Sequence, residues 1–323
     1  MKLVKGDFID DLDRWIADYF DILTTYSDNI NTKDNYERAL NHFREYCLGY
    51  QDDYSLDKLN QRFFIGFLSY LKKEMKHSSS TINTYLIVVK IFFNYISINN
   101  SDEIDYSKIL KEVKPIKDKE SKNKKVKYFK DEDRKKIENY IEKKIVGTMY
   151  KDPSFFAVRN YILIKLLLYT GIRVSELIGI KLSDLKTNPK RPNQYKIKIL
   201  GKGDYIRTVN IRKEIIDKKA LKIFKEHLEQ YNIDIDYIAI TKTGKRLNRI
   251  RVWEITTALA KRLFITVGNP HSYRHSLGSM LVTKEKISSS VGAKVLGHKD
   301  TRTFDKFYVH VDEEDVEDIA DLL

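Results

Sequence analysis

The chain has 323 residues, of which 42% are hydrophobic and 33% charged, and its formal net charge is +13. This hydrophobic content excludes a disordered chain, and the single cysteine, Cys47, excludes both an internal disulfide and a cysteine-based zinc site. No stretch approaches the roughly 18 consecutive apolar residues of a membrane span, and no secretory leader is recognisable. We therefore expect a soluble cytoplasmic protein with no membrane partner and, at about 150 residues per domain, two domains.

The N-terminal region predicts four amphipathic helices. Apolar residues recur at helical spacing over 8–25, 32–49, 55–75 and 80–98, and Ser55 is a candidate N-cap for the third segment. Four such helices in so short a stretch predict a compact helical domain over 1–110. Residues 111–127 then contain eight lysines and almost no apolar side chains, which indicates a linker. A basic linker can follow a DNA backbone, or it can simply be solvated.

The rest of the chain, residues 128–323, predicts a second domain with mixed structure. Helical patterns cover 131–144, 158–170, 249–264, 271–284 and 288–296, and Gly171 is placed to end the second of these. Residues 195–200 and 205–211 are rich in β-branched and aromatic side chains and flank a glycine-containing turn, which predicts a hairpin. A further short strand is expected at 237–241. The fold class is thus mainly α, with an α+β second domain that holds a small antiparallel sheet.

Charge is distributed unevenly along the chain. Residues 1–120 sum to −3, residues 131–310 to +18, and residues 311–323 to −7. A strongly basic domain suits a polyanion such as nucleic acid, because cationic side chains displace the counterions condensed on phosphates. The alternative is a charge excess that only aids solubility. The acidic end carries apolar residues at helical spacing, which predicts a tail helix over 312–323 with Val316, Ile319, Leu322 and Leu323 on one face.

Four short patterns in the second domain fall in a specific order. They are Thr-Gly-Ile-Arg-Val-Ser-Glu-Leu at 170–177, Gly-Lys-Gly at 201–203, His-Ser-Tyr-Arg-His at 271–275, and Leu-Gly-His at 296–298 followed by Tyr-Val-His at 308–310. Each pattern alone is weak, since arginines at helix junctions and lysines in turns are usually solvated. In the combination and order of these four patterns, the chain resembles the tyrosine recombinase (phage integrase) family, most closely its compact Xer-type members. The resemblance covers nearly the whole chain and implies an N-terminal core-binding domain and a C-terminal catalytic domain.

The resemblance also implies the site residues. Carried over motif by motif, the candidate catalytic set is Arg173, Lys202, His271, Arg274, His298 and the nucleophile Tyr308. Glu176, one turn after Arg173, is expected to orient that arginine, although it could also be an ordinary surface carboxylate. The family commonly places its tyrosine nine residues after the last histidine of the set. Position nine here is Phe307, which has no hydroxyl, so the tenth residue, Tyr308, is assigned, on a slightly longer loop.

The residue types fit phosphodiester transfer. Two guanidiniums suit the extra negative charge of a pentavalent phosphorus, and a histidine adds a hydrogen bond or acts as acid or base near neutral pH. An ammonium on a hairpin tip can protonate the leaving deoxyribose oxygen, and a phenol nucleophile conserves the bond energy as a phosphotyrosine. We therefore expect no cofactor and no metal, and the sequence has no phosphate-binding loop for ATP.

The resemblance further implies the partners. Family members bind double-stranded DNA with inverted-repeat half-sites, work as homo-tetramers on two duplexes through a Holliday junction, and often pass a C-terminal helix to the next subunit. The tail here could instead pack on its own domain. Two other functions share the fold: a type IB topoisomerase that relaxes DNA as a monomer, and a catalytically inactive DNA-binding regulator. Both chromosome-dimer resolution and movement of a mobile element are consistent with the leading reading, in which the enzyme associates with the nucleoid.

Overall fold

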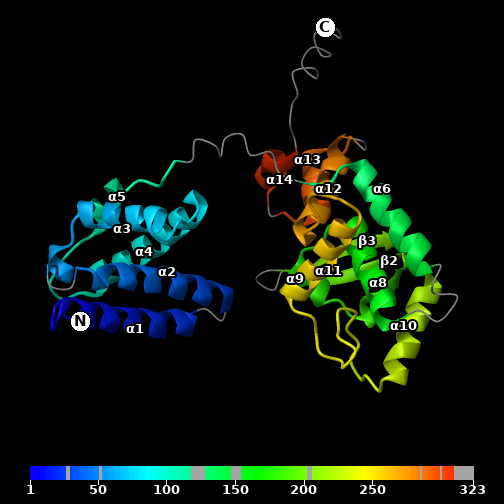
Figure 1. Cartoon of the computed structure of the whole chain (residues 1–323), viewed down its shortest axis with the longest axis horizontal. Helices are drawn as coiled ribbons and strands as arrows, with labels where there is room; N and C mark the ends of the chain where they lie inside the picture. Colours follow the sequence, from blue (N-terminus) through cyan, green and yellow to red (C-terminus); the bar gives the residue numbers. More distant parts are fainter. Residues whose placement is uncertain are drawn as a thin grey trace, which may run out of the picture. The chain divides into compact units, whose positions relative to one another are not determined.

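Two units divide the chain, Met1–Lys124 and Lys125–Leu323. The structure is a computed structural model, and it describes residues 1–26, 30–50, 53–117, 128–146, 154–201, 206–283, 286–298 and 300–308. Helices predominate in both units (Figure 1). The predicted fold class is confirmed: a helical N-terminal unit precedes a mainly helical unit with a small antiparallel sheet.

The first unit contains the four predicted helices and a fifth, short one. Their bounds are α1 (Phe8–Tyr26), α2 (Ile30–Leu48), α3 (Gln61–Lys73), α4 (Ser79–Asn99) and α5 (Ser107–Glu112). Aromatic rings fill the core between them: Phe43 stacks on Phe64 at 6.0 Å and meets Phe93 edge-on at 5.4 Å. Such ring pairs add about 0.5–1.5 kcal/mol each beyond the area that they bury.

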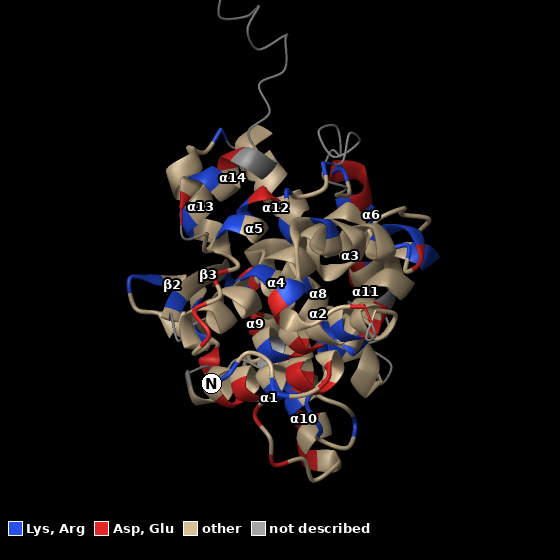
Figure 2. Cartoon of the chain, turned by 90° about the vertical axis from the view of Figure 1, so that its left-hand side faces the viewer, with Lys and Arg blue, Asp and Glu red and all other residues tan. Residues whose placement is uncertain are grey.

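Ion pairs support this core at its edge. Helix α1 carries several aspartates, coloured red in Figure 2. The carboxylate of Asp13 accepts two hydrogen bonds from Arg44 of α2, at 2.5 and 2.6 Å. Asp11 is buried and accepts from the backbone N–H of Lys5. These contacts fix the chain entering α1 and hold α1 against α2.

The third helix begins later than predicted. Ser55 precedes a 3₁₀ turn, η1 (Leu56–Lys58), and its side chain makes no capping hydrogen bond. Leu59 is extended, and Asn60 is the N-cap of α3, with its side-chain oxygen accepting from the N–H of Phe63 at 3.1 Å. An amide side chain at this position satisfies one of the free N–H groups of the first turn as well as a serine does, so the predicted cap at Ser55 is wrong and the helix begins five residues later.

Helix α4 is the central helix of this unit. By length and composition alone it is apolar enough to cross a membrane. It contacts α1, α2, α3 and α5, however, and its buried side chains form part of the aromatic core. Those buried residues are Ile82, Tyr85, Leu86, Val88, Val89, Phe92, Phe93 and Ile96. We conclude that its hydrophobicity reflects a core helix.

The start of the predicted linker packs on the first unit. Val113 is fully buried, and its carbonyl accepts a hydrogen bond from Nζ of Lys90 at 2.8 Å. The side chain of Asn83 pairs with both the N–H and the carbonyl of Ile116, at 2.8 and 3.0 Å. Residues 111–116 therefore include contacts with the first unit, and the remaining predicted linker, 118–127, lies outside the described residues.

The second unit surrounds one nearly all-apolar helix. Its helices are α6 (Asp131–Tyr140), continued by a π-helical turn η3 (Ile141–Val146), α8 (Phe155–Thr170), α9 (Val174–Ile178), α10 (Lys218–Gln230), α11 (Arg249–Arg262), α12 (Pro270–Thr283), α13 (Ser289–Leu296) and α14 (Thr301–Tyr308). Helix α8 is buried along most of its length and contacts α9, α10, α12 and strand β3 (Ile206–Arg212). A helix that is hydrophobic all round belongs in the middle of a domain.

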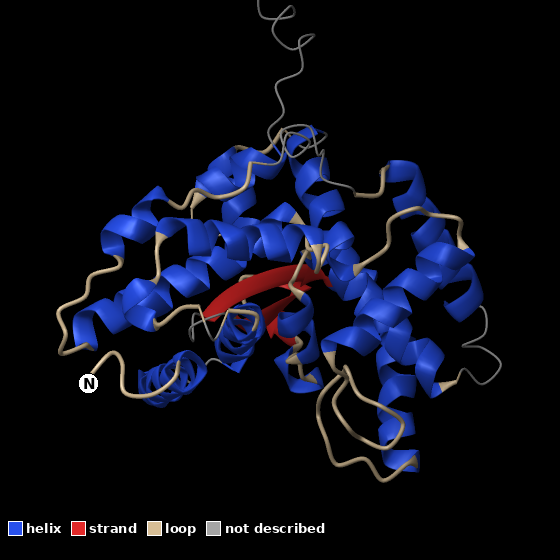
Figure 3. Ribbon diagram, turned by 60° about the vertical axis from the view of Figure 1, so that its left-hand side comes forward, coloured by secondary structure: helices blue, strands red, loops and turns tan. Residues whose placement is uncertain are grey.

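The predicted hairpin is present and is part of a three-stranded sheet, in the order β1 (Lys186–Asn188), β2 (Arg191–Leu200), β3. Figure 3 shows this sheet among the helices. All pairs are antiparallel, and Ile197 of β2 lies opposite Val209 of β3 with both side chains buried. The hairpin turn, 202–205, lies outside the described residues.

The prediction of a strand at 237–241 is wrong. This apolar segment makes two isolated bridges, Lys181 with Tyr237 and Ile240 with Arg246. Its backbone groups bond to separate segments: the N–H of Ile238 donates to the carbonyl of Ile180, and Thr241 donates to Lys245. The side chains are buried, but no continuous ladder forms, because the partners do not lie along one strand.

Candidate active site

Gly171 ends α8 as predicted and brings the candidate residues together. It adopts the left-handed conformation (φ 58°) and closes the last turn of the helix. A Cβ at this position would lie 2.8 Å from Cδ2 of Leu296 and 2.9 Å from Cδ2 of Leu277, so any other residue would displace both leucines as well as strain the backbone. The chain then turns directly into Arg173, the N-cap residue of α9. The turn places Arg173 where its side chain reaches the carbonyl of Gly297 at the end of α13.

Glu176 holds the guanidinium of Arg173. Nη1 of Arg173 donates to the Glu176 carboxylate at 3.1 Å, and the backbone N–H of Arg173 donates to the same carboxylate at 2.7 Å. Nη2 donates to the carbonyl of Gly297 at 3.3 Å. The side chain of Arg173 is 45% exposed while that of Glu176 is buried. The guanidinium of Arg173 is thus held by Glu176 and Gly297, and its exposed part is accessible to a ligand.

Arg274 on α12 is buried and has an unused donor. Its Nη1 donates to the carbonyl of Gly171 at 2.8 Å. Its Nη2 is buried and has no hydrogen-bond partner among the described residues. Burial, followed by the nearby Arg173, lowers the pKa of Arg274 to about 10, which still leaves it charged at neutral pH. A buried guanidinium with a free donor suits an anionic ligand such as a phosphate.

The histidines of the site are held neutral. Burial, then Arg274 and Arg173, lowers the pKa of His298 to about 4, and the same causes in the same order lower the pKa of His271. Nδ1 of His298 is buried without a partner among the described residues. A neutral imidazole offers one donor and one acceptor, so these rings can hydrogen-bond to an oxyanion or take up a proton.

Tyr308 lies inside this cluster, at the end of α14 rather than on the loop that we expected. Its ring lies parallel to that of His298, with centroids 6.2 Å apart, and 5.4 Å from that of His275. Gly278 of α12 makes room for it, since a Cβ there would lie 2.5 Å from the ring. Burial raises the pKa of Tyr308 to about 12, although Arg274 and Arg173 act to lower it. The phenol is therefore protonated at neutral pH and must lose its proton to react as a nucleophile.

The structure thus brings together six of the seven predicted residues: Arg173, Glu176, His271, Arg274, His298 and Tyr308. Lys202 lies outside the described residues. The sequence reasoning missed two residues of the cluster, His275 and Arg207. The ring of His275 lies 4.2 Å from that of His271, one helical turn away, and this spacing was visible in the sequence.

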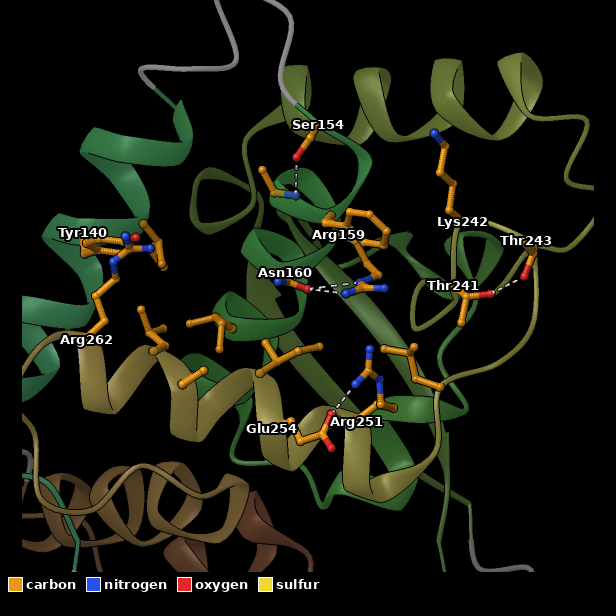
Figure 4. Close-up of a pocket in the computed structure, with 18 residues that line it drawn as sticks. Tyr140, Ser154, Arg159, Asn160, Thr241, Lys242, Thr243, Arg251, Glu254 and Arg262 are labelled. Carbon is orange, nitrogen blue, oxygen red and sulfur yellow. Dashed lines mark hydrogen bonds and ion pairs between the residues drawn. The ribbon is translucent and has the colours of Figure 1, made fainter.

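A pocket of the second unit lies away from these residues. It has a volume of about 970 Å³ between α8 and α11 and contains none of the predicted residues (Figure 4). Arg159 reaches into it from α8, with Nη1 donating to the carbonyl of Ile240 at 2.8 Å. An ion pair between Arg251 and Glu254 borders it. The candidate active site is therefore defined by converging side chains and not by this cavity.

These features define a class of protein: a two-part, mainly helical chain whose second unit surrounds a buried tyrosine with arginines and histidines. The model of the phage integrase family matches residues 135–315, and that of the phage integrase SAM-like domain matches residues 14–100. Since the first match covers more than half of the sequence, the chain belongs to the phage integrase family.

Its relatives narrow the class to Xer-type tyrosine recombinases. The chain is 25% identical over 310 residues to tyrosine recombinase XerD of Oceanobacillus iheyensis. The aligned region covers 93% of this chain and 94% of the relative. It is 33% identical over 163 residues to tyrosine recombinase XerH of Campylobacter jejuni, 48% of this chain and 42% of the relative. The chain is accordingly a tyrosine site-specific recombinase of the Xer type.

Solved structures share the fold. A XerH site-specific recombinase in a pre-cleavage complex with its difH substrate aligns with a TM-score of 0.79 and 21% identity, over 99% of this chain and 98% of that one. A lambda integrase tetramer bound to a Holliday junction aligns with a TM-score of 0.64 and 15% identity, over 92% of this chain and 77% of that one.

Proposed function

We propose that the protein cleaves and rejoins double-stranded DNA through a 3′-phosphotyrosine intermediate on Tyr308. The observation that carries this proposal is the placement of a buried phenol beside His298 and among the cations Arg173 and Arg274, with a free donor on Arg274. A hydroxyl nucleophile next to donors that match a phosphate is the minimum equipment for phosphodiester transfer.

The chemistry needs no external energy. The Tyr308 hydroxyl oxygen bonds to phosphorus as the bond to the 5′ oxygen breaks, and the phenol proton passes to a histidine of the cluster. Arg173, Arg274 and His298 stabilise the charge on the non-bridging oxygens. Lys202, by the family resemblance, protonates the departing 5′ oxygen. Rejoining is the reverse attack, by a 5′ hydroxyl of either duplex, so the phosphodiester energy is conserved.

A covalent capture experiment tests this proposal. Fragmented genomic DNA from the source organism is incubated with the full chain, and complexes that resist denaturant are sequenced to define the target. Tryptic mapping of the adduct should then find the nucleotide on the peptide that contains Tyr308. An adduct on another residue would overturn the assignment of the nucleophile, and the complete absence of adducts would favour an inactive DNA-binding regulator.

DNA binding is proposed from charge and from the neighbours. The XerH structure that shares this fold is a complex with DNA, and residues 131–310 of this chain carry +18. Figure 2 shows Lys and Arg along β2 of the sheet, and the exposed Lys196 and Lys198 lie on that strand. We propose that the second unit is the catalytic domain, that the first is the core-binding domain, and that both bind inverted-repeat half-sites.

The dependence of binding on salt follows from this charge. The logarithm of the association constant should fall linearly with the logarithm of salt concentration, with a slope of about −0.9 for each phosphate contacted. Fluorescence anisotropy with the captured duplex over a salt series measures that slope. An affinity that does not change with salt would remove the electrostatic basis of the proposal.

We also propose assembly as a homo-tetramer that exchanges strands through a Holliday junction. The lambda integrase that shares the fold is a tetramer on such a junction. The predicted tail, 312–323, lies outside the described residues, and we propose that it passes to the next subunit. Its seven acidic residues and its apolar face suit a docking segment. The enzyme would act on DNA in the cytoplasm, at the nucleoid.

Deletion of residues 314–323 tests the role of the tail. The deletion leaves every proposed catalytic residue in place, so binding to a single half-site and covalent attachment should survive. Cooperative filling of the second half-site and strand exchange should be lost, because each buried aliphatic side chain contributes roughly 1.5–3 kcal/mol. Gel-shift titration of paired half-sites measures the cooperativity. A truncated protein that fills them as cooperatively as the full chain would place the tail on its own subunit.

A further inference from the structure

Arg207 is a buried arginine that joins three parts of the second unit. It is 8% exposed and projects from the inner face of β3, where Val209 and Ile211 are also buried. Its Nη2 donates to the Glu176 carboxylate of α9 at 2.9 Å, and its Nη1 donates to the carbonyl of Val295 on α13 at 3.0 Å. The fixed fork of a guanidinium allows both contacts at once.

The end of α13 is shaped around this side chain. Gly297 adopts the left-handed conformation (φ 72°), and a Cβ there would lie 2.7 Å from both Cδ and Nε of Arg207. The carbonyl of the same glycine accepts from Nη2 of Arg173, and the next residue is His298. The segment before His298 is thus bonded to both arginines: the carbonyl of Val295 accepts from Arg207, and that of Gly297 accepts from Arg173.

We propose that Arg207 is the positioning residue of the active site, which fixes Glu176, and through it Arg173, against the end of α13 that carries His298. Arg207 also lies in the strand that follows the hairpin turn of Lys202, so it ties that strand to the same network. We assign it no direct contact with the phosphate, because both of its terminal nitrogens are bonded, to Glu176 and Val295, and its remaining donor, Nε, is buried against Gly297 without a partner among the described residues. The inference rests on the proposed function, which assigns Arg173 and His298 to phosphoryl transfer.

Glu176 is the member of this network that can report on it through pH. Burial acts to raise the pKa of Glu176, but the ion pairs with Arg207 and Arg173 prevail and hold it below its usual range. Arg274 is the other cation whose charge couples to this carboxylate. Without Arg207 the pKa of Glu176 should rise. The carboxylate would then be protonated at mildly acidic pH, and Arg173 would lose its partner there.

The central experiment measures the rate of covalent complex formation at saturating DNA, with a nicked synthetic duplex of the captured target. Arg207→Met should slow this step about 10- to 100-fold, the size of effect known for partners that orient metal-bound side chains, while the affinity for the duplex stays near that of the wild type. The rate of Arg207→Lys should lie between those of the wild type and Arg207→Met, since one ammonium cannot reach both Glu176 and Val295.

The pH profile separates positioning from a loss of stability. The rate of Arg207→Met should begin to fall at a higher pH than that of the wild type, because the loss of Arg207 lets the pKa of Glu176 rise. Arg207 also acts to lower the pKa of His298, so the part of the shift that belongs to Glu176 is the part that adding Glu176→Gln removes. The double variant should otherwise lose little further rate, because both changes break one network. Losses that multiply in the double variant would overturn the proposal.

Arg159→Met is the matched control. Arg159 is also a buried arginine of the second unit, 6% exposed and bonded to a backbone carbonyl, but it lies in the pocket of Figure 4, which contains none of the site residues. Its loss should lower the melting temperature and leave the rate per folded molecule unchanged. The proposal fails if Arg207→Met, or Arg207→Lys where the methionine variant does not fold, behaves like this control. If the wild type forms no covalent complex, the proposed function itself has failed.

Discussion

Tyr308→Phe should abolish the covalent protein–DNA complex and leave DNA binding intact. The substitution removes only the attacking oxygen, and the ring still fills the space between His298, His275 and Gly278. Because no other residue is proposed to form the phosphotyrosine, the loss should be complete rather than partial. Denaturing gels of protein incubated with the nicked target duplex measure the adduct, and a gel shift under native conditions measures binding.

Phe307→Tyr in the Tyr308→Phe background is the natural companion. The family spacing points to position 307 and the structure to position 308, so this double variant offers a hydroxyl one residue early. We expect no adduct, since Tyr308 is the proposed nucleophile and its hydroxyl is absent from this variant. An adduct on Tyr308→Phe itself would contradict the assignment and require a different nucleophile.

Arg173→Ala and Arg274→Ala should each slow cleavage by about 10²–10³-fold, the equivalent of about 3–4 kcal/mol, because each removes a donor that acts mainly in the transition state. Affinity for DNA should change far less. The two variants should differ in stability. Arg274 is buried and bonds to the carbonyl of Gly171, so its loss leaves that group unpaired, whereas Arg173 is half exposed. Single-turnover cleavage at saturating duplex, together with thermal unfolding, separates the two effects.

Arg212→Ala is the control for these arginines. Arg212 is an exposed arginine of β3 whose ion pair with Glu214 is also exposed, and such pairs contribute little to stability. It should cleave at the wild-type rate. If Arg173→Ala or Arg274→Ala cleaves normally but binds poorly, that arginine is a phosphate anchor and not a transition-state donor.

The sequence predicted most helices because their apolar residues recur at the spacing of a buried face. Helix α8 is mostly apolar and is buried along most of its length, and Gly171 ends it as predicted. The site residues followed from the family resemblance that the four motifs carry, and the structure brings six of the seven together. The segment 237–241 was wrongly predicted as a strand because its apolar residues indicate burial but not pairing. Its side chains are buried, but its backbone bonds to separate segments.

The position of Arg207 could be predicted from the sequence, but its partners could not. It occupies the first inward position of β3, ahead of the buried Val209 and Ile211, so the strand period placed a charge on the inner face. The sequence could not show that Glu176 and the carbonyl of Val295 lie opposite, since these partners are distant in the chain. Helix α14 was missed because its polar first turn has no apolar periodicity before Phe304.

The most direct measurement is incubation of the protein with a supercoiled plasmid that carries two copies of the captured target site. A site-specific recombinase should convert it into recombinant products, deletion circles or inversions according to the orientation of the sites, and only when both sites are present. Relaxed topoisomers without recombinants would contradict this account and identify a topoisomerase, and a bare gel shift with unchanged DNA would identify a binding protein.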